Sequence, residues 1–184
     1  MTTETLSVAT VEATSRPEII EGERALLFAK ELANDARNTV LEPGVFIDPR
    51  YLQDNAHGQA VELKCGKEII DWPLGSIVGA EGFSSWELGN VFSDDLKDHK
   101  TSAQIMKDYS ELPTDIPPID FGLEVYLTPT GRIFASSHNA HRVGAAKLKE
   151  QKSIGVDTEL CGIVVRGISD EAIDKALSWV RGEW

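Results

Sequence analysis

Alternating apolar and polar residues predict a β-hairpin in the second half of the chain. Leu123, Val125 and Leu127 alternate with Glu124 and Tyr126, which is the period of a strand with one buried face. The four residues 128–131, Thr-Pro-Thr-Gly, have proline second and glycine fourth, as β-turns prefer. Residues 132–135 then return as a second strand. The pattern therefore predicts two strands joined by a tight turn.

Elsewhere the apolar residues recur mainly at helical spacing. This spacing, with cap-like residues, predicts helices over 19–37, 93–109, 141–149 and from Ser169-Asp170-Glu171 onward. The first is preceded by Ser15-Arg16-Pro17-Glu18, which resembles a capping box with an early proline. Short apolar runs split by glycine and proline predict strands and turns over 45–92, with turns at 79–82, and 159–166 reads as a short strand. These elements predict an α+β fold with a small mixed sheet.

The distribution of prolines and polar residues suggests how the chain is divided. Residues 1–14 are rich in Thr, Ser and Glu, lack a basic secretory signal, and read as a flexible tail. Pro113, Pro117 and Pro118 suggest an extended connection. We therefore expect an acidic mixed α/β accessory region over 15–112 and a second portion over 113–184. One continuous domain over 15–184 is the alternative.

Composition limits the classes of partner. The net charge of -12 argues against non-specific DNA binding, and no apolar run is long enough to cross a membrane. The two cysteines make no disulfide framework, so we expect a reduced, cytoplasmic setting. The charge is uneven, because residues 131–152 contain five basic residues and one acid. This segment is either a surface that faces an anion or an ordinary solvated helix face.

Candidate chemistry gathers where the hairpin leads into the helix over 141–149. Ser136, Ser137 and Asn139 are placed to cap that helix or to bind an anion, because a helix start offers unpaired N–H groups and partial positive charge. His141 and Arg142 fall in the first turn, where a guanidinium can bind phosphate oxygens in a bidentate manner. The alternative for Arg142 is an ion pair with one of the acids in the first 124 residues, and the alternative for His141 is a helix cap.

The residues 131–148, Gly-Arg-Ile-Phe-Ala-Ser-Ser-His-Asn-Ala-His-Arg-Val-Gly-Ala-Ala-Lys-Leu, resemble the signature of the ParB/sulfiredoxin superfamily. In that superfamily a strand with a glycine turn leads into a His-Arg box, an alanine-rich helix and a further strand. The resemblance covers the C-terminal half. It implies a ParB/sulfiredoxin-like fold for that portion and nucleotide phosphate binding by Ser136, Ser137, His138, Asn139, His141 and Arg142.

Departures from this signature narrow the activities that it implies. Ala140 stands where sulfiredoxin needs a cysteine, and Ser136-Ser137 replace the acidic-Gly pair of hydrolytic and kinase-like members. Only 18 residues follow Arg166, which is too short for the DNA-reading helix-turn-helix of the partitioning proteins.

Metal-binding candidates are few. His138 and His141 are three residues apart, but no further ligands are evident nearby in the sequence. Asp94 and Asp95 are candidates for Mg²⁺ beside a phosphate, although acids at this position also suit an exposed helix start.

Two functional hypotheses follow from the sequence. The first is a nucleotide-binding protein that takes ATP or CTP with Mg²⁺, with phosphoryl-transfer or nuclease chemistry in which His141 acts as acid or base. The second is a non-catalytic interaction module that binds a protein partner through its acidic surface. Basic residues gathered around 136–142 beside a cleft would favour the nucleotide. The same residues paired with acids across a filled surface would favour the interaction module.

Overall fold

A computed structural model describes residues 16–42, 45–80, 108 and 111–183. Within them, one mixed sheet runs in the spatial order β1 (Glu18–Glu21), β2 (Ala56–Lys64), β8 (Ile163–Ile168), β5 (Leu123–Leu127), β6 (Ile133–Ser137) and β4 (Ile77–Ala80). A second, two-stranded sheet joins β3 (Ile69–Pro73) to β7 (Ser153–Asp157). The helices are α1 (Gly22–Ala36), α2 (Pro49–Asn55), α5 (Ala140–Leu148) and α6 (Asp170–Arg181), with short 3-10 turns η1 (Arg37–Thr39) and η2 (Leu74–Ser76).

The main sheet contains both parallel and antiparallel pairs. Strands β2 and β8 are antiparallel, as are β5 and β6, whereas β1–β2, β5–β8 and β4–β6 are parallel. The chain is therefore an α+β protein, which confirms the predicted fold class. The three strands that follow residue 122, β8, β5 and β6, lie between β2 and β4, which precede residue 81, so both parts of the sequence build one sheet.

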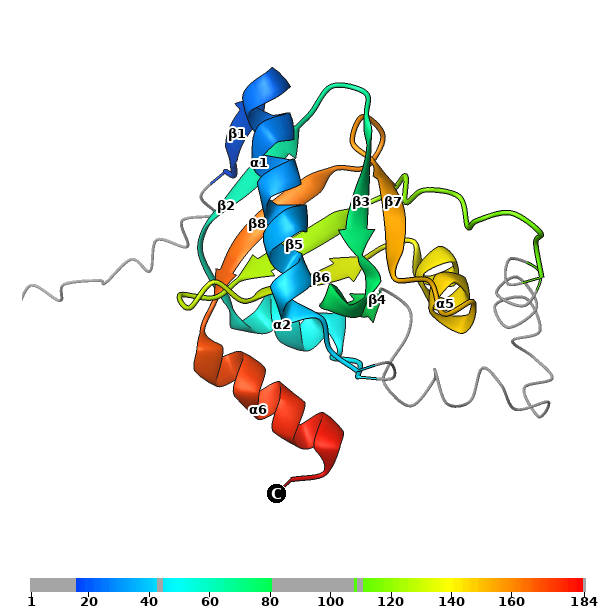
Figure 1. The fold of residues 1–184 in the computed structure, drawn as a ribbon. Coiled ribbons are helices and arrows are strands. Elements are labelled where there is room, and N and C mark those ends of the chain that lie inside the picture. The colour runs from blue at the N-terminus through cyan, green and yellow to red at the C-terminus, as the bar shows by residue number, and fades with distance from the viewer. Residues whose placement is uncertain (1–15, 43–44, 81–107, 109–110, 184) are drawn as a thin grey trace, which may run out of the picture.

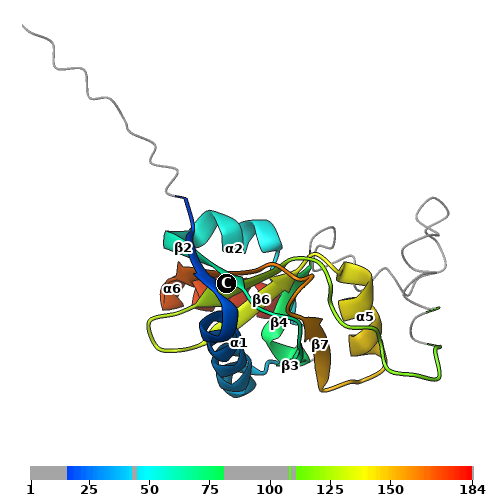
Figure 2. The ribbon, with the colours of Figure 1, turned by 90° about the horizontal axis from the view of Figure 1, so that it is seen from above.

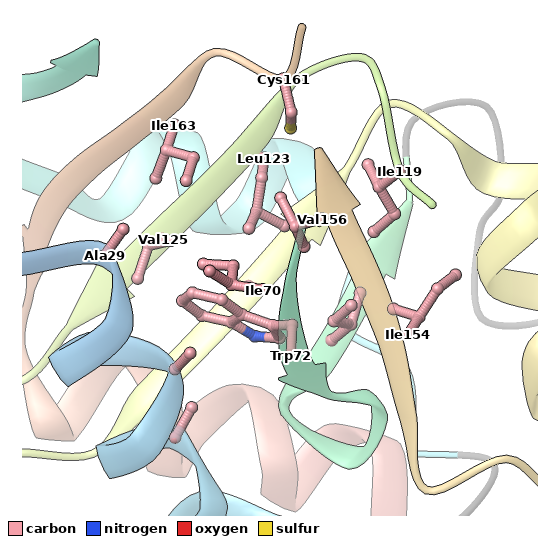
Figure 3. Close-up of a cluster of buried hydrophobic side chains, with 14 of the residues drawn as sticks. Ala29, Ile70, Trp72, Ile119, Leu123, Val125, Ile154, Val156, Cys161 and Ile163 are labelled. Carbon is pink, nitrogen blue, oxygen red and sulfur yellow. The ribbon is translucent and has the colours of Figure 1, made fainter. Parts of the chain in front are cut away.

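One face of the sheet, called here the α1 face, is covered by helix α1 and the β3–β7 pair (Figures 1 and 2). Alanines at 25, 29, 33 and 36 are buried on α1 and let the helix lie close to its neighbours. Trp72 fills the centre of this core against Ile70, Leu123 and Val125 (Figure 3). Its indole N–H donates to the Ser76 hydroxyl at 2.9 Å, so the buried polar atom is satisfied.

The opposite face, called here the α2 face, holds a second core. Side chains of Tyr126, Phe134 and Ile168 point to this face and pack with residues of α2 and α6. Figure 2 shows α2 and α1 on opposite sides of the sheet. Of the helices described, none is long and apolar enough to cross a membrane.

The local sequence signals near the C-terminal end are confirmed. Strands β5 and β6 form the predicted hairpin, and the turn closes with Gly131 N–H donating to the Thr128 carbonyl at 2.9 Å. Helix α5 occupies 140–148. Helix α6 begins after Ser169, whose hydroxyl accepts a 3.1 Å hydrogen bond from Ala172 N–H.

Several element predictions were wrong in detail. The first helix does not include Ile19 and Ile20, because they form β1 and pair with Glu62 and Leu63 of β2. Helix α2 was not predicted within 45–92. Gly79 and Ala80 belong to strand β4 and do not make a turn, whereas 81–82 lie outside the described residues, as does most of the helix expected over 93–109.

The strand expected over 159–166 begins later, at Ile163, and runs to Ile168. It is preceded by a strand, β7, that was not predicted. A turn over 158–160 separates the two strands.

Candidate functional site

Ser136 and Ser137 are the last two residues of β6, which runs two residues past the end of the strand predicted over 132–135. Both are buried, because β6 lies between β5 and β4. The Cα of Ser136 pairs with Gly79 of β4, where an added Cβ would come within 3.2 Å of the Ser136 hydroxyl oxygen. The glycine therefore allows β4 to approach the serine closely, and the two hydroxyls lie inside the fold.

Asn139 connects the start of α5 to the loop before β5. Its side-chain Oδ1 accepts hydrogen bonds from the N–H groups of Asp120 at 2.9 Å and Phe121 at 3.0 Å. Its own N–H donates to the Ser137 hydroxyl at 3.0 Å. Asn139 is the N-cap residue of α5, yet its side chain gives no capping bond to the helix. The amide thus organises the loop instead of capping α5.

Arg142 is held by the same loop. Its Nη1 lies 3.0 Å from Asp120 Oδ2 and also donates to the Pro118 carbonyl. The side chain is 22% exposed, and Asp120 is 40% exposed. The ion pair with an acid from the first 124 residues, which was the alternative role for Arg142, is therefore present. The loop over 118–121 is tied to the first turn of α5 by both Arg142 and Asn139.

His138 packs against the other end of this loop. Its N–H donates to the Gly122 carbonyl at 2.9 Å, and its ring meets Phe121 edge-on with 5.4 Å between the centroids. Gly122 has a φ of +53°, and an added Cβ would lie 2.4 Å from His138 Cδ2. Glycine is thus required there for both conformation and space. Phe121 is 63% exposed, which leaves an aromatic ring on the surface beside the start of α5.

The remaining predicted site residues are His141 and the two aspartates Asp94 and Asp95. His141 is partly buried in the first turn of α5, one residue before Arg142. Asp94 and Asp95, the predicted metal ligands, lie outside the described residues. Within the described part of the chain, no group of three or more His, Cys, Asp or Glu residues is placed to hold a metal ion.

Most basic residues of the 131–152 segment have partners within the protein. Arg132 Nη1 lies 2.8 Å from an Asp174 oxygen and 3.4 Å from Asp170. Lys147 Nζ donates to the Ile77 carbonyl at 2.7 Å, and burial lowers the pKa of this amine to about 8. Lys149 Nζ donates to the carbonyls of Leu112 and Thr114. These cations therefore bond within the protein, Arg132 to α6 and the two lysines beside α5, and their presence in the sequence is not by itself a sign of an anion site.

Sequence reasoning missed the loop over 118–121, which it treated as part of a linker. Asp120 follows the Pro117-Pro118 pair, and this proline pair beside an acid was the available signal. The contact with α5 could not be read from it, because 18 or more residues separate Asp120 and Phe121 from Asn139.

Comparison with known proteins adds no identification. No protein-family model matches the chain, and no curated protein matches it significantly in sequence.

Proposed function

We propose that the chain binds a nucleotide, ATP or CTP with Mg²⁺, through its phosphates at the start of α5, as the ParB/sulfiredoxin resemblance implies. The observation that carries this proposal is the diverted side chain of Asn139, which leaves the first turn of α5 without a capping bond from its N-cap residue. Uncapped N–H groups and the helix dipole favour an anion at such an end.

The position of Arg142 supports the same proposal. A guanidinium has five N–H donors, and the described partners of Arg142, Asp120 and Pro118, engage its Nη1 alone. Its partly exposed side chain therefore keeps donors on Nε and Nη2 that can bind phosphate oxygens. Asp120 holds the Arg142 guanidinium in place, but its carboxylate competes with a phosphate for the positive charge of that guanidinium.

The remaining site residues have defined roles in this proposal. His141, in the first turn of α5, binds a phosphate oxygen or acts as acid or base in any phosphoryl-transfer or nuclease reaction. His138 packs beside the same turn, while the buried hydroxyls of Ser136 and Ser137 support it from within the sheet. Asp94 or Asp95 would supply the Mg²⁺ ligand.

The test is thermal unfolding with ATP, CTP, GTP and ADP, each with and without Mg²⁺. A ligand that binds the folded state alone stabilises it by about 2.7 kcal/mol when its concentration is 100 times Kd. We expect a rise in Tm for the wild type and none for Arg142→Ala. Asp120→Asn, which removes the competing charge, should respond at least as strongly as the wild type.

Arg181→Ala, at the exposed end of α6, is the control for the loss of a positive charge and should behave as the wild type. The proposal is wrong if no nucleotide at millimolar concentration raises Tm. It is also wrong if the Arg142→Ala and Arg181→Ala variants respond alike.

A second candidate, the non-catalytic interaction module, is favoured by one specific observation. Arg132, Arg142, Lys147 and Lys149 all bond to acids or carbonyls of the protein, as expected if they serve the fold and not a ligand. The exposed ring of Phe121 beside Asp120 would then contact a protein partner. The same unfolding experiment separates the candidates, because an interaction module should respond to no nucleotide in any variant.

A further inference from the structure

A second group of polar side chains lies on the α2 face, across the sheet from Ser136. In the strand register, Ser136 pairs with Glu124, and Arg166 pairs with Tyr126. Residues paired across neighbouring strands, and residues two apart on one strand, point to the same face. Because Tyr126 packs in the α2-face core, Glu124, Arg166 and Ser136 share this face.

Arg166 is a partly buried arginine without an acceptor in the described part of the chain. Its Nε is buried and makes no hydrogen bond there, and its guanidinium forms no ion pair with a described residue. Arg132 and Arg142, which are also partly exposed, each pair with an acid. A buried charged donor that lacks an acceptor is costly, so a native structure that keeps one calls for an explanation.

Glu124 is fixed beside Arg166 with one oxygen available. Its Oε2 accepts both the Tyr126 hydroxyl at 2.9 Å and the Gln53 side-chain amide at 3.0 Å. Its Oε1 accepts no hydrogen bond from a described residue. The carboxylate is therefore oriented by β5 and α2 together, and an acceptor oxygen is left on the same face as the donors of Arg166.

Gly162 lies at the end of the sheet where α5 begins, since the neighbouring Ile163 pairs with Leu123 and Leu123 with Ser137. At Gly162, which precedes β8, an added Cβ would have no described heavy atom within 4 Å. Glu62 adds a further carboxylate on this face, because it pairs with Val164, which in turn pairs with Glu124. One arginine among two carboxylates gives no net attraction for a phosphate. This set of one arginine and two carboxylates suits a neutral group that offers both acceptors and donors.

We propose that Arg166 and Glu124 bind the base of the nucleotide, with Arg166 donating to a ring nitrogen or carbonyl and Glu124 Oε1 accepting from an amino or ring N–H group. This inference rests on the proposed function, because the phosphates would occupy the start of α5. Ser136 links the two places: it pairs with Glu124 on one side, and α5 starts four residues later in sequence. Arginine and glutamate are side chains that read the edges of bases in this way.

The experiment compares a nucleotide with the phosphate chain alone. Calorimetric titration with ATP, CTP, GTP and sodium tripolyphosphate, all with Mg²⁺, gives the ratio of nucleotide affinity to tripolyphosphate affinity. For the wild type we expect at least one nucleotide to bind about tenfold more tightly than tripolyphosphate, as one or two charge-assisted hydrogen bonds would give. Arg166→Gln and Glu124→Gln should each bring this ratio close to one.

Two further variants keep the test decisive. If Arg166→Gln does not fold, Arg166→Lys takes its place. Lysine retains the charge but not the fork of donors, so this variant should lose most of the ratio of nucleotide affinity to tripolyphosphate affinity. Arg181→Gln should keep the wild-type ratio. If neither nucleotide nor tripolyphosphate binds, the proposed function itself fails. If nucleotide and tripolyphosphate bind equally to the wild type, or if the ratio survives in both Arg166→Gln and Glu124→Gln, the base site is wrong although the phosphate site stands.

Discussion

At the scale of single residues, Lys147 shows how burial changes the meaning of a charge. The side chain reaches from α5 to the Ile77 carbonyl at the start of β4, and no carboxylate of the described residues bonds to it. From the sequence this lysine belonged to a basic segment that could face an anion. In the structure its amine is enclosed instead, and desolvation disfavours the charged form.

This environment predicts a stability that depends on pH. The pKa of the Lys147 amine falls from 10.5 to about 8 in the folded state. Between these values the unfolded chain holds a proton that the folded chain has lost, so the free energy of unfolding should rise with pH. Relative to Lys147→Met, the wild type should gain about 1–3 kcal/mol over this range.

The measurement is urea unfolding of both proteins at several pH values from neutral to alkaline. The comparison cancels the titration of other groups, such as Tyr126, which both proteins share. Lys152→Met removes a charge from an exposed position and should show no such trend against the wild type. A constant difference between wild type and Lys147→Met at all pH values would contradict the prediction.

At the scale of elements, the sequence predicted those parts whose causes are local. The β5–β6 hairpin follows from alternation and a four-residue turn, and α6 follows from a serine cap and an apolar stripe. Strand β1 could not be predicted, because Ile19 and Ile20 are strand residues by virtue of pairing with β2 about forty residues later. In the same way β7 depends on its pairing with β3. Long-range pairing overrode the local preference in both places.

The local cause of α6 makes a direct prediction. Ser169→Ala removes the hydroxyl that accepts the Ala172 N–H, and should lower the free energy of unfolding by about 1 kcal/mol. Ser178→Ala lies inside the same helix, where alanine is the better helix former, and should change stability little or raise it slightly. Denaturant unfolding of the two variants checks this, and an equal effect of both substitutions would show that the cap is not what holds the start of α6.

At the scale of the whole molecule, the main sheet connects the two portions that the proline-rich segment seemed to separate, because the later strands lie between β2 and β4. Trp72, from the earlier portion, and Cys161 and Ile163, from the later one, belong to a single buried cluster (Figure 3). Cys161 is 1% exposed, and burial is the main cause that raises the pKa of its thiol to about 12. Such a thiol is protected from alkylation until the cluster opens.

We therefore expect both portions to unfold in one cooperative transition. In a Cys65→Ser background, brief alkylation of Cys161 across a guanidinium chloride series reports the later portion. The fluorescence of Trp72, retained as the sole tryptophan, reports the earlier one, and the two midpoints should coincide.

Ile163→Val, which removes one methyl group from the shared cluster, should lower the free energy of unfolding by about 1 kcal/mol as reported by both probes. If Cys161 became reactive at a distinctly different denaturant concentration from the change at Trp72, or if Ile163→Val moved one midpoint alone, the portions would be separate folding units. The shared sheet would then be a docking contact between them.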